Sequence, residues 1–251
     1  MSKFDGRVAI ITGAGRGIGQ AYAKSLAEEG AKICVTDIID TDNTVNIIKQ
    51  AGGDAIGIQA NVLDKDQIDA MVATTIETYG KVDIMVTNAA LFADLEQKSF
   101  MDISEDEWDR VMQVNTRGVF TCAKAVVPEM RKNQYGKIVN IASGTVFKGT
   151  PMLLHYVSSK GAMIAFTRAL ARELGDDNIC VNALAPGLTM SEKVIGQEQW
   201  ESIKDANAAS RAIKRAELPE DLVGAMKFLC SSDSDFMTGQ TMLVDGGSAM
   251  H

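Results

Sequence analysis

The chain has 251 residues, 46% of them hydrophobic and 23% charged, which is typical of a globular protein and excludes collagen and a disordered chain. Lys and Arg total 25 against 33 Asp and Glu, so the net charge of −8 repels nucleic acid and anionic lipid. No apolar run approaches the roughly 18 residues that cross a bilayer, and Met1–Arg7 lacks the apolar stretch of a signal peptide. These features predict a cytoplasmic protein without a nucleic-acid or membrane partner.

Cysteine and histidine usage gives little support for a metal site. The two histidines are His155 and His251, and the cysteines have no close spacing, so we expect reduced cysteines in the core at Cys34, Cys122, Cys180 and Cys230. A zinc mechanism would lack ligands in such a chain. We therefore expect chemistry that uses no metal.

Short β-branched runs alternate with longer segments of helical period along the whole chain. The runs are Val8–Thr12, Ile33–Thr36, Ala55–Ile58, Val82–Val86, Lys137–Ile141, Ile179–Ala183 and Met242–Val244. Strands that are apolar on both faces predict a parallel sheet covered by helices on both sides, a three-layer doubly wound α/β fold. No linker or repeat interrupts the pattern, so we expect one domain over residues 1–251.

Helix boundaries can be read at two places. Ser104 and Glu107 have the spacing of a capping box, which predicts a helix entering near Glu105. Pro219 suits the first turn of a later helix, where its missing N–H is harmless. Residues 190–217 are the least strand-like segment, and we interpret them as a mobile flap over the substrate site.

A glycine-rich loop follows the first strand and opens the first helix, as a dinucleotide site requires. Glycines let the backbone approach a pyrophosphate, and free N–H groups at the helix start favour its charge. The alternative is a tight turn without a ligand. The expected cofactor contacts in this loop are Thr12, Gly13, Gly15, Arg16, Gly17, Ile18 and Gly19.

Asp37 follows the second predicted strand, where an acidic side chain can accept the hydroxyls of an adenosine ribose. A 2′-phosphate would meet a like charge there, so we predict NAD rather than NADP, with Ile38 lining the same site. Arg16 leaves use of NADP open, because it can reach a phosphate. A solvated carboxylate at a strand end is the alternative interpretation of Asp37.

Tyr156 and Lys160 are four residues apart in a helical segment, so both project from one face. The pair alone also fits an ordinary surface pair, but Ser143 ends a strand at the sheet edge where such folds bind ligands. We expect Lys160 to lower the pKa of Tyr156 by about 3 units, enough for proton transfer at neutral pH. Ser143 would then hydrogen-bond the substrate oxygen while a hydride passes between carbon atoms.

These motifs together resemble the short-chain dehydrogenases/reductases in their compact single-domain form. The resemblance runs from Gly6 to Gly247 and rests on Thr12-Gly-x-x-x-Gly-x-Gly19, Asn61-Val62, Asn88-Ala-Ala90, Asn115, Ser143, Tyr156-x-x-x-Lys160 and Pro186-Gly187. It implies a Rossmann-type fold with a seven-stranded parallel sheet, and a homotetramer in which the helices carrying Asn115 and Tyr156 meet at one interface. Asn61, Ala90 and Ser191 stand where the family commonly has aspartate, glycine and threonine.

The resemblance also implies residue roles. Asn115 would join Ser143, Tyr156 and Lys160 as a catalytic residue, holding a water that links Lys160 to solvent, with a local break in its helix. Further cofactor contacts would come from Asn61 and Val62 at the adenine, from Asn88, Ala89 and Ala90 beside the central sheet, and from Pro186, Gly187, Thr189 and Ser191 at the nicotinamide carboxamide.

The residues expected around the substrate are mostly apolar, which suits a small to medium hydrophobic secondary alcohol or its ketone. Ser143 and Tyr156 would be joined there by Thr145, Phe147, His155 and Met190. Lys148, Arg211 and Lys214 leave a sugar or hydroxy-acid substrate open. A ketoreductase for acyl-carrier-protein substrates is a further alternative, which the net charge disfavours, and a non-catalytic dinucleotide sensor is a remote one.

Overall fold

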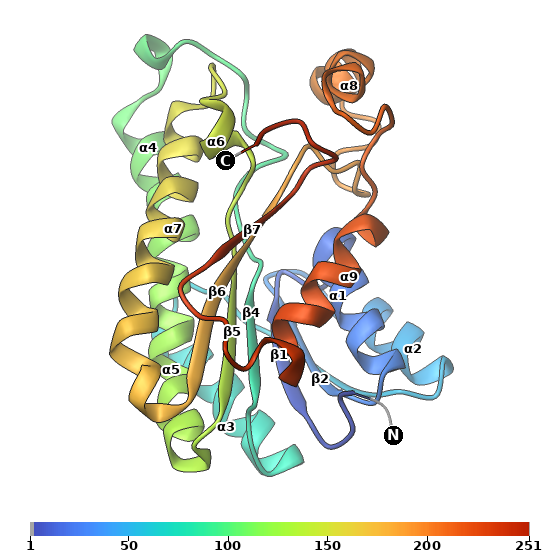
Figure 1. Cartoon of the computed structure of the whole chain (residues 1–251), viewed down its shortest axis with the longest axis vertical. Coiled ribbons are helices and arrows are strands. Elements are labelled where there is room, and N and C mark those ends of the chain that lie inside the picture. The colour runs from blue at the N-terminus through green and yellow to red at the C-terminus, as the bar shows by residue number, and fades with distance from the viewer. Residues whose placement is uncertain (1–2, 251) are drawn as a thin grey trace.

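Within residues 3–250, seven strands form one parallel sheet in the order β3-β2-β1-β4-β5-β6-β7 (Figure 1). They are β1 (Val8–Thr12), β2 (Lys32–Asp37), β3 (Asp54–Gln59), β4 (Ile84–Thr87), β5 (Gly136–Ile141), β6 (Ile179–Pro186) and β7 (Thr241–Val244). All seven predicted strands are present, and the Rossmann-type α/β fold is confirmed. The order reverses between β1 and β4, which places a crevice at the carboxyl ends of these strands.

The structure is a computed structural model that describes residues 3–250. Met1, Ser2 and His251 lie outside these residues, so the interpretation of the extreme amino terminus and of the second histidine stays a prediction. None of the helices in this described part combines the length and apolar character needed to cross a membrane.

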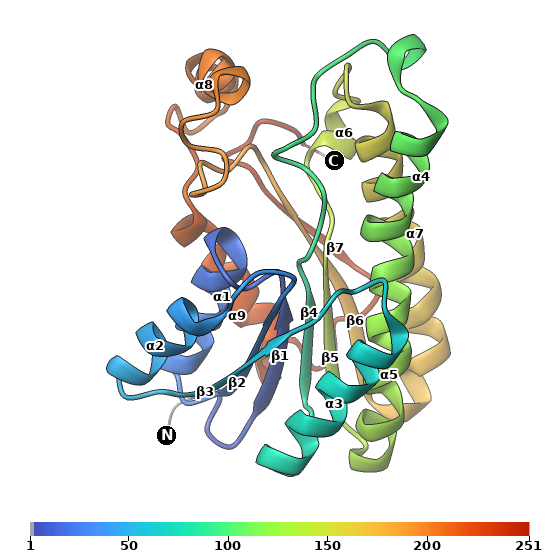
Figure 2. The same ribbon diagram turned by 180° about the vertical axis from the view of Figure 1, so that it is seen from behind.

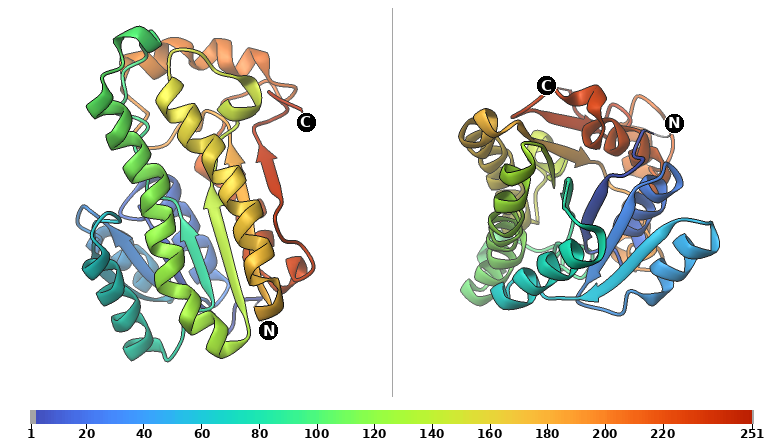
Figure 3. Two further views of the ribbon diagram at one scale, coloured as in Figure 1. Left: turned by 90° about the vertical axis from the view of Figure 1, so that its left-hand side faces the viewer. Right: turned by 90° about the horizontal axis from the view of Figure 1, so that it is seen from below.

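Helices cover both faces of the sheet (Figures 1 and 3). One face carries α1 (Gly17–Glu28), α2 (Asp42–Gln50) and α9 (Pro219–Cys230). The other carries α3 (Lys65–Tyr79), α4 (Glu105–Met112), α5 (Gly118–Asn133) and α7 (Leu154–Leu174). Two further helices, α6 (Thr145–Lys148) and α8 (Glu198–Ser210), lie at the carboxyl end of the sheet, where Figure 2 shows α8 opposite α4 and α6.

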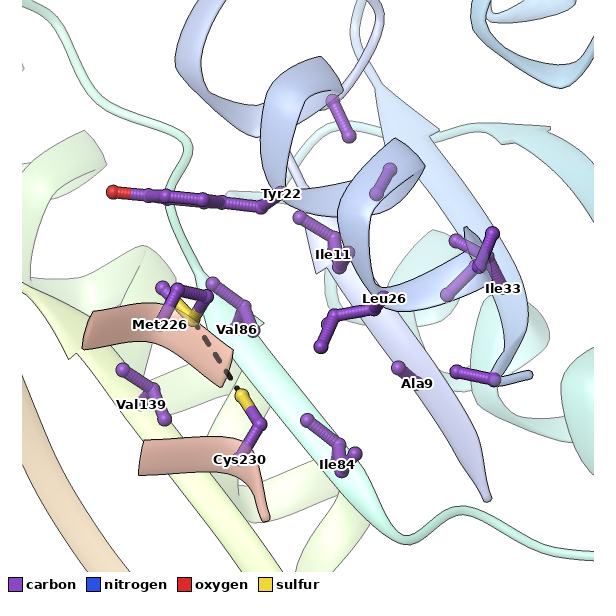
Figure 4. Packing of buried hydrophobic residues seen from close by; sticks show 14 of the residues in the cluster. Ala9, Ile11, Tyr22, Leu26, Ile33, Ile84, Val86, Val139, Met226 and Cys230 are labelled. Atoms are coloured by element: carbon purple, nitrogen blue, oxygen red, sulfur yellow. Dashed lines mark hydrogen bonds between the residues drawn. The ribbon is translucent and has the colours of Figure 1, made fainter. Parts of the chain in front are cut away.

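Alternation along the strands divides the core into two layers, because successive strand side chains point to opposite faces. Ile11 of β1 packs with Leu26 and Met226 from α1 and α9 (Figure 4), whereas its neighbour Ile10 packs with Met71 from α3 on the other face. A fully buried side chain of this kind contributes about 1.5–3 kcal/mol. The two layers together hold the strand ends, and therefore the crevice, in place.

The predicted helix starts are found, but one is capped differently from expectation. Ser104 caps α4 by accepting the N–H of Glu107 at 3.2 Å. The Glu107 side chain does not return to the cap; it accepts from Lys98 at 2.8 Å and contacts His155 at 3.2 Å. Lys98 and His155 thus take the place of the Ser104 N–H as partners of the Glu107 carboxylate. The helix predicted at Pro219 begins there, as α9.

Three of the four cysteines lie in the core, as expected, and their burial raises the pKa of the thiols of Cys34 to about 11 and of Cys122 and Cys230 to about 12. Cys180 differs, because it is only partly buried and its thiol donates to the Asp235 carbonyl at 3.4 Å.

Candidate active site

A cleft of about 710 Å³ opens at the carboxyl ends of the strands, under α8. It brings together most of the residues that the sequence predicts for the site. Those on its wall are Gly13, Arg16, Gly17, Ile18, Gly19, Asp37, Ile38, Asn61, Val62, Asn88, Ala89, Ala90, Ser143, Thr145, Tyr156, Lys160, Pro186, Gly187, Thr189 and Ser191.

The glycine loop needs its glycines because other backbone passes close to it. A Cβ on Gly13, whose φ is +65°, would lie 2.8 Å from the Cα of Ala89, and a Cβ on Gly19 would lie 2.3 Å from the Gly13 carbonyl oxygen. The Asn88 side chain donates to the carbonyls of Thr12 and Gly13, both at 3.0 Å. These contacts fix the loop against the end of β4.

Thr12 and Gly15 support this loop without lining the cleft. The Thr12 hydroxyl oxygen accepts the backbone N–H groups of Asn88 at 3.0 Å and Ala89 at 3.1 Å, so it ties β1 to β4 beneath the glycines. The Gly15 N–H donates to Asp37 at 2.9 Å. Both residues therefore lie behind the cleft wall, and their direct contact with a cofactor stays a prediction.

The start of α1 offers backbone N–H groups to an anion. Among the described residues, no side chain caps this helix, whose N-cap is Arg16. Gly17 and Ile18 in the first turn line the cleft. Orphaned N–H groups and the positive end of the helix dipole together favour a phosphate at this position. These features fit the pyrophosphate of a dinucleotide.

Asp37 lies at the end of β2, beside the glycine loop. One carboxylate oxygen accepts the Gly15 N–H at 2.9 Å and the other accepts the Ile39 N–H at 3.2 Å. Two backbone donors hold the carboxylate in one orientation at the cleft wall, where it can still accept hydroxyl groups with its remaining lone pairs.

Ser143 follows β5, and Tyr156 and Lys160 lie on the same face of α7, all three within the cleft. The Ser143 hydroxyl oxygen accepts from the Thr145 hydroxyl at 3.0 Å and is hydrogen-bonded to Tyr156. The Lys160 Nζ donates to the Ile141 carbonyl at 2.7 Å and lies 5.8 Å from the centre of the Tyr156 ring. The predicted serine, tyrosine and lysine thus form one cluster.

The expected effect of Lys160 on Tyr156 is wrong for the protein alone. Burial raises the pKa of Tyr156 to about 12, against a smaller lowering by its hydrogen bond with Ser143. Burial also lowers the pKa of Lys160 to about 8. Desolvation disfavours both charged forms, and the sequence could not show how deeply the pair is buried. Tyr156 therefore keeps its proton at neutral pH unless a further positive charge enters the cleft.

Asn115 lies in the local break that was expected, a π-helical turn over Gln113–Arg117 between α4 and α5. It is buried, and its amide is engaged with the backbone of Leu91, accepting the N–H at 2.8 Å and donating to the carbonyl at 3.2 Å. A second amide hydrogen goes to the Ser159 hydroxyl at 3.0 Å. The Asn115 side chain thus holds the loop after β4 against α7, and its link to Lys160 through water stays a prediction.

Three predicted substrate contacts are not on the cleft wall. His155 is fully buried and faces Glu107 on α4, because neighbouring residues of a helix point about 100° apart and Tyr156 takes the direction of the cleft. Phe147 of α6 packs against the buried cluster that contains Met163. Met190 lies behind the wall, in the cluster with Tyr156 and Trp200.

The flap is fastened across the cleft by contacts that sequence spacing does not indicate. Trp200 donates its indole N–H to the Ala93 carbonyl at 2.9 Å and stacks on Phe92 with ring centres 4.7 Å apart. Phe92 also packs against the Tyr156 ring in a tilted arrangement, with ring centres 4.9 Å apart. An ion pair joins Lys193 of the flap to Asp94. These partners are about 100 residues apart along the chain, so only the fold brings them together.

The sugar or hydroxy-acid alternative depended on Lys148, Arg211 and Lys214, and these three side chains have different surroundings in the structure. Lys148 lines the cleft. Lys214 donates to the Ala209 carbonyl at 2.8 Å. Arg211 is buried and donates to the carbonyls of Leu188 and Arg215, both at 2.8 Å, so it supports the flap and does not face a substrate.

Residues 13–249 match the family profile described as enoyl-(acyl carrier protein) reductase. The chain is 38% identical over 253 residues to dehydrogenase/reductase SDR family member 4 of Bos taurus, covering 98% of this chain and 88% of the relative. The chain belongs to the short-chain dehydrogenase/reductase family.

Further relatives in this family carry different names. The short-chain reductase protein NovJ of Streptomyces niveus is 37% identical over 96% of this chain and 93% of its own length. The 3-oxoacyl-[acyl-carrier-protein] reductase FabG of Staphylococcus epidermidis is 36% identical over 96% and 98%. A solved structure from Sinorhizobium meliloti, provisionally designated a short-chain alcohol dehydrogenase, superposes with a TM-score of 0.91 at 33% identity, covering 98% of each chain.

The three positions that depart from the usual family pattern all lie on the cleft wall. The Asn61 side chain accepts the N–H of Leu63 at 3.0 Å, so asparagine forms the turn there. Ala90 adds a methyl group beside the loop that Asn115 holds. Ser191 lies 3.6 Å from the position that a Cβ on Gly17 would occupy, facing the glycine loop across the cleft.

Proposed function

We propose that the protein is an NAD-dependent oxidoreductase that interconverts a small to medium, mainly hydrophobic secondary alcohol and its ketone. The observation that carries this proposal is the cluster of Ser143, Tyr156 and Lys160 in a cleft whose other end contains the glycine loop and Asp37. The family supports an oxidoreductase, and the site residues supply the choice of cofactor and substrate class.

The cofactor choice rests on Asp37. Its two backbone hydrogen bonds keep a carboxylate at the cleft wall, and a ribose 2′-phosphate brought against it would repel it. The ribose hydroxyls of NAD can instead donate to it. We therefore expect kcat/KM with NAD to exceed that with NADP by well over tenfold, with equal use counting against the role of Asp37.

Each member of the cluster has a separate task. Tyr156 transfers a proton to or from the substrate oxygen, Ser143 hydrogen-bonds the same oxygen, and Lys160 brings a positive charge to their side of the cleft. When bound, an oxidised nicotinamide supplies the hydride acceptor and a second positive charge. With Lys160 in place the pKa of Tyr156 is about 12, and bringing it to 7 corresponds to about 7 kcal/mol, so Tyr156 needs the charge of the bound cofactor in addition to Lys160 to act as a base.

The walls around the cluster support an apolar substrate. Besides Phe92 and Trp200, the side chains that face this part of the cleft are largely aliphatic, among them Leu91, Val114, Met152, Leu153, Leu188, Val194 and Ile203. A few polar groups at a mainly apolar wall are typical of sites that bind small hydrophobic molecules.

The decisive experiment is Tyr156→Phe, measured with a panel of secondary alcohols and NAD by NADH absorbance at alkaline pH. We expect a loss of nearly all turnover with unchanged NADH binding by calorimetry. Tyr79→Phe, which removes a hydroxyl bonded to Asp54 far from the cleft, is the matched control. Activity of Tyr156→Phe within tenfold of the parent protein would reject the proton-transfer role.

The similarity to FabG favours a second candidate, reduction of a 3-oxoacyl thioester. A carrier protein is acidic and docks best on a basic surface, whereas this chain has a net charge of −8. Assay with an acetoacetyl thioester and reduced cofactor separates the two, since the first proposal expects better kcat/KM on the panel ketones. Turnover of any substrate would exclude a dinucleotide sensor.

A further inference from the structure

The backbone on either side of Ser143 is fixed to β6. Ala142 donates its N–H to the Leu184 carbonyl at 2.8 Å, and Gly144 donates its own to the Pro186 carbonyl at the same distance. A Cβ on Gly144 would lie 3.2 Å from the Pro186 oxygen, so the two segments are in close contact. Ser143 itself is only 5% exposed. Its place in the cleft is therefore set by the sheet, and only its hydroxyl group is left to be oriented.

One residue donates two hydrogen bonds to the Ser143 hydroxyl oxygen. Thr145, the first residue of α6, donates its backbone N–H to Oγ of Ser143 at 3.3 Å and its side-chain hydroxyl to the same atom at 3.0 Å. A hydroxyl oxygen has two lone pairs and one hydrogen. Thr145 thus occupies both lone pairs of Ser143, and the hydrogen of Ser143 remains for another partner.

Tyr156 is that partner in the protein alone. The hydrogen bond between Ser143 and Tyr156 lowers the pKa of Tyr156. Only a donor to the tyrosine oxygen acts in this direction, because it stabilises the phenolate. The carbonyl oxygen of a ketone and the alkoxide oxygen of an alcohol also accept hydrogen bonds and cannot donate them. Every reacting oxygen of the proposed reaction therefore needs Ser143 as a donor.

We propose that Thr145 is a positioning residue that holds Ser143 as a hydrogen-bond donor to the reacting oxygen atoms. The inference rests on the proposed function and adds a residue that acts through Ser143. A serine hydroxyl that rotates freely about its C–O bond also presents a lone pair, which a phenolate or alkoxide oxygen repels. The two bonds from Thr145 remove that orientation. Direct contact with the substrate is the alternative role, since Thr145 also lines the cleft.

Thr145→Val tests this role, because valine keeps the shape and the backbone N–H and lacks the hydroxyl. We expect kcat for alcohol oxidation at pH 7 to fall about fivefold, the value of one neutral hydrogen bond, with KM changed by less than about twofold. Thr145→Ser should behave like the parent protein. Thr78→Val on α3, which removes an exposed hydroxyl bonded to the Thr74 carbonyl at 2.8 Å, is the matched control. A loss that lies in KM with kcat unchanged would overturn the inference in favour of substrate contact.

Titration of Tyr156 measures the same bond without turnover. The ring carbon next to the hydroxyl is labelled with ¹³C in all four tyrosines, and Tyr156→Phe identifies the signal in the NMR spectrum. With NAD present, the pKa of Tyr156 should be about 0.7 unit higher in Thr145→Val than in the parent protein, which is the same factor of five. The rising limb of kcat against pH should move by the same amount. Equal pKa values in the two proteins would overturn the inference.

A double-mutant cycle shows whether Thr145 acts through Ser143. In Ser143→Ala the bond between the two side chains is already lost, so adding Thr145→Val should change kcat by less than about twofold. A further fivefold loss would overturn the inference, since Thr145 would then act independently of Ser143. If the parent protein turns over no alcohol or ketone of the panel, the proposed function is rejected, and the titration of Tyr156 still decides the role of Thr145.

Discussion

Replacing Lys160 by methionine should make the protein more stable while removing its activity. The Lys160 ammonium is 3% exposed, and burial lowers its pKa from 10.5 to about 8. A lowered pKa means that the folded state disfavours the charged form, so the site is less stable with a charged lysine than with an apolar chain of similar length. We therefore attribute the ammonium at this position to the proposed function and not to stability.

The expected magnitude follows from the pKa. A shift from 10.5 to about 8 corresponds to about 3 kcal/mol at pH 7, where Lys160 is charged in both the folded and the unfolded state. Loss of the hydrogen bond to the Ile141 carbonyl offsets about 1 kcal/mol. We therefore expect Lys160→Met to raise the free energy of unfolding by about 2 kcal/mol, or Tm by about 4–8 °C.

The pH dependence provides the sharper check. Between pH 8 and 10.5, folded Lys160 is neutral while unfolded Lys160 is still protonated, so the parent protein gains stability as pH rises. The advantage of Lys160→Met should shrink through this window and disappear above it. Urea unfolding at pH 7 and 10.5 measures it, with exposed Lys49→Met on α2 as control. The reasoning would be refuted if Lys160→Met were no more stable than the parent protein at pH 7. It would also be refuted if the gain in the free energy of unfolding were equal at both pH values.

Three other predictions concern the cleft, the support of α7 and the assembly. Gly19→Ala should abolish NADH binding in calorimetry, because its Cβ would lie 2.3 Å from a backbone oxygen; Gly224→Ala in α9, with open space around it, should bind normally, and equal binding by both would contradict the cofactor fit. Glu107→Ala should lower the free energy of unfolding by about 1–3 kcal/mol, since it leaves the buried His155 without a partner, whereas exposed Glu105→Ala should change it by less than about 0.5 kcal/mol in the same urea titration. Light scattering at micromolar concentration should give a homotetramer, and a monomer would reject the expected α5 and α7 interface.

Local sequence determined the features that depend on neighbouring residues. Glycines between a strand and a helix favour a loop that another group can approach closely, and four-residue spacing on a helix puts Tyr156 and Lys160 on one side. The seven strands could also be predicted locally, because runs that are apolar on both faces favour a parallel sheet covered by helices on both sides. Fold and central cluster could therefore be predicted from the residues and the family resemblance.

Tertiary structure decided what depends on distant partners and on burial. Adjacent positions 155 and 156 face different ways because α4 supplies Glu107 to the histidine while the cleft takes the tyrosine. Desolvation reversed the expected direction of the pKa of Tyr156, and spacing gives no measure of how much water a folded site excludes. Glu217 reaches Thr189 across 28 residues of chain, through a flap whose path is set by packing and not by any local pattern.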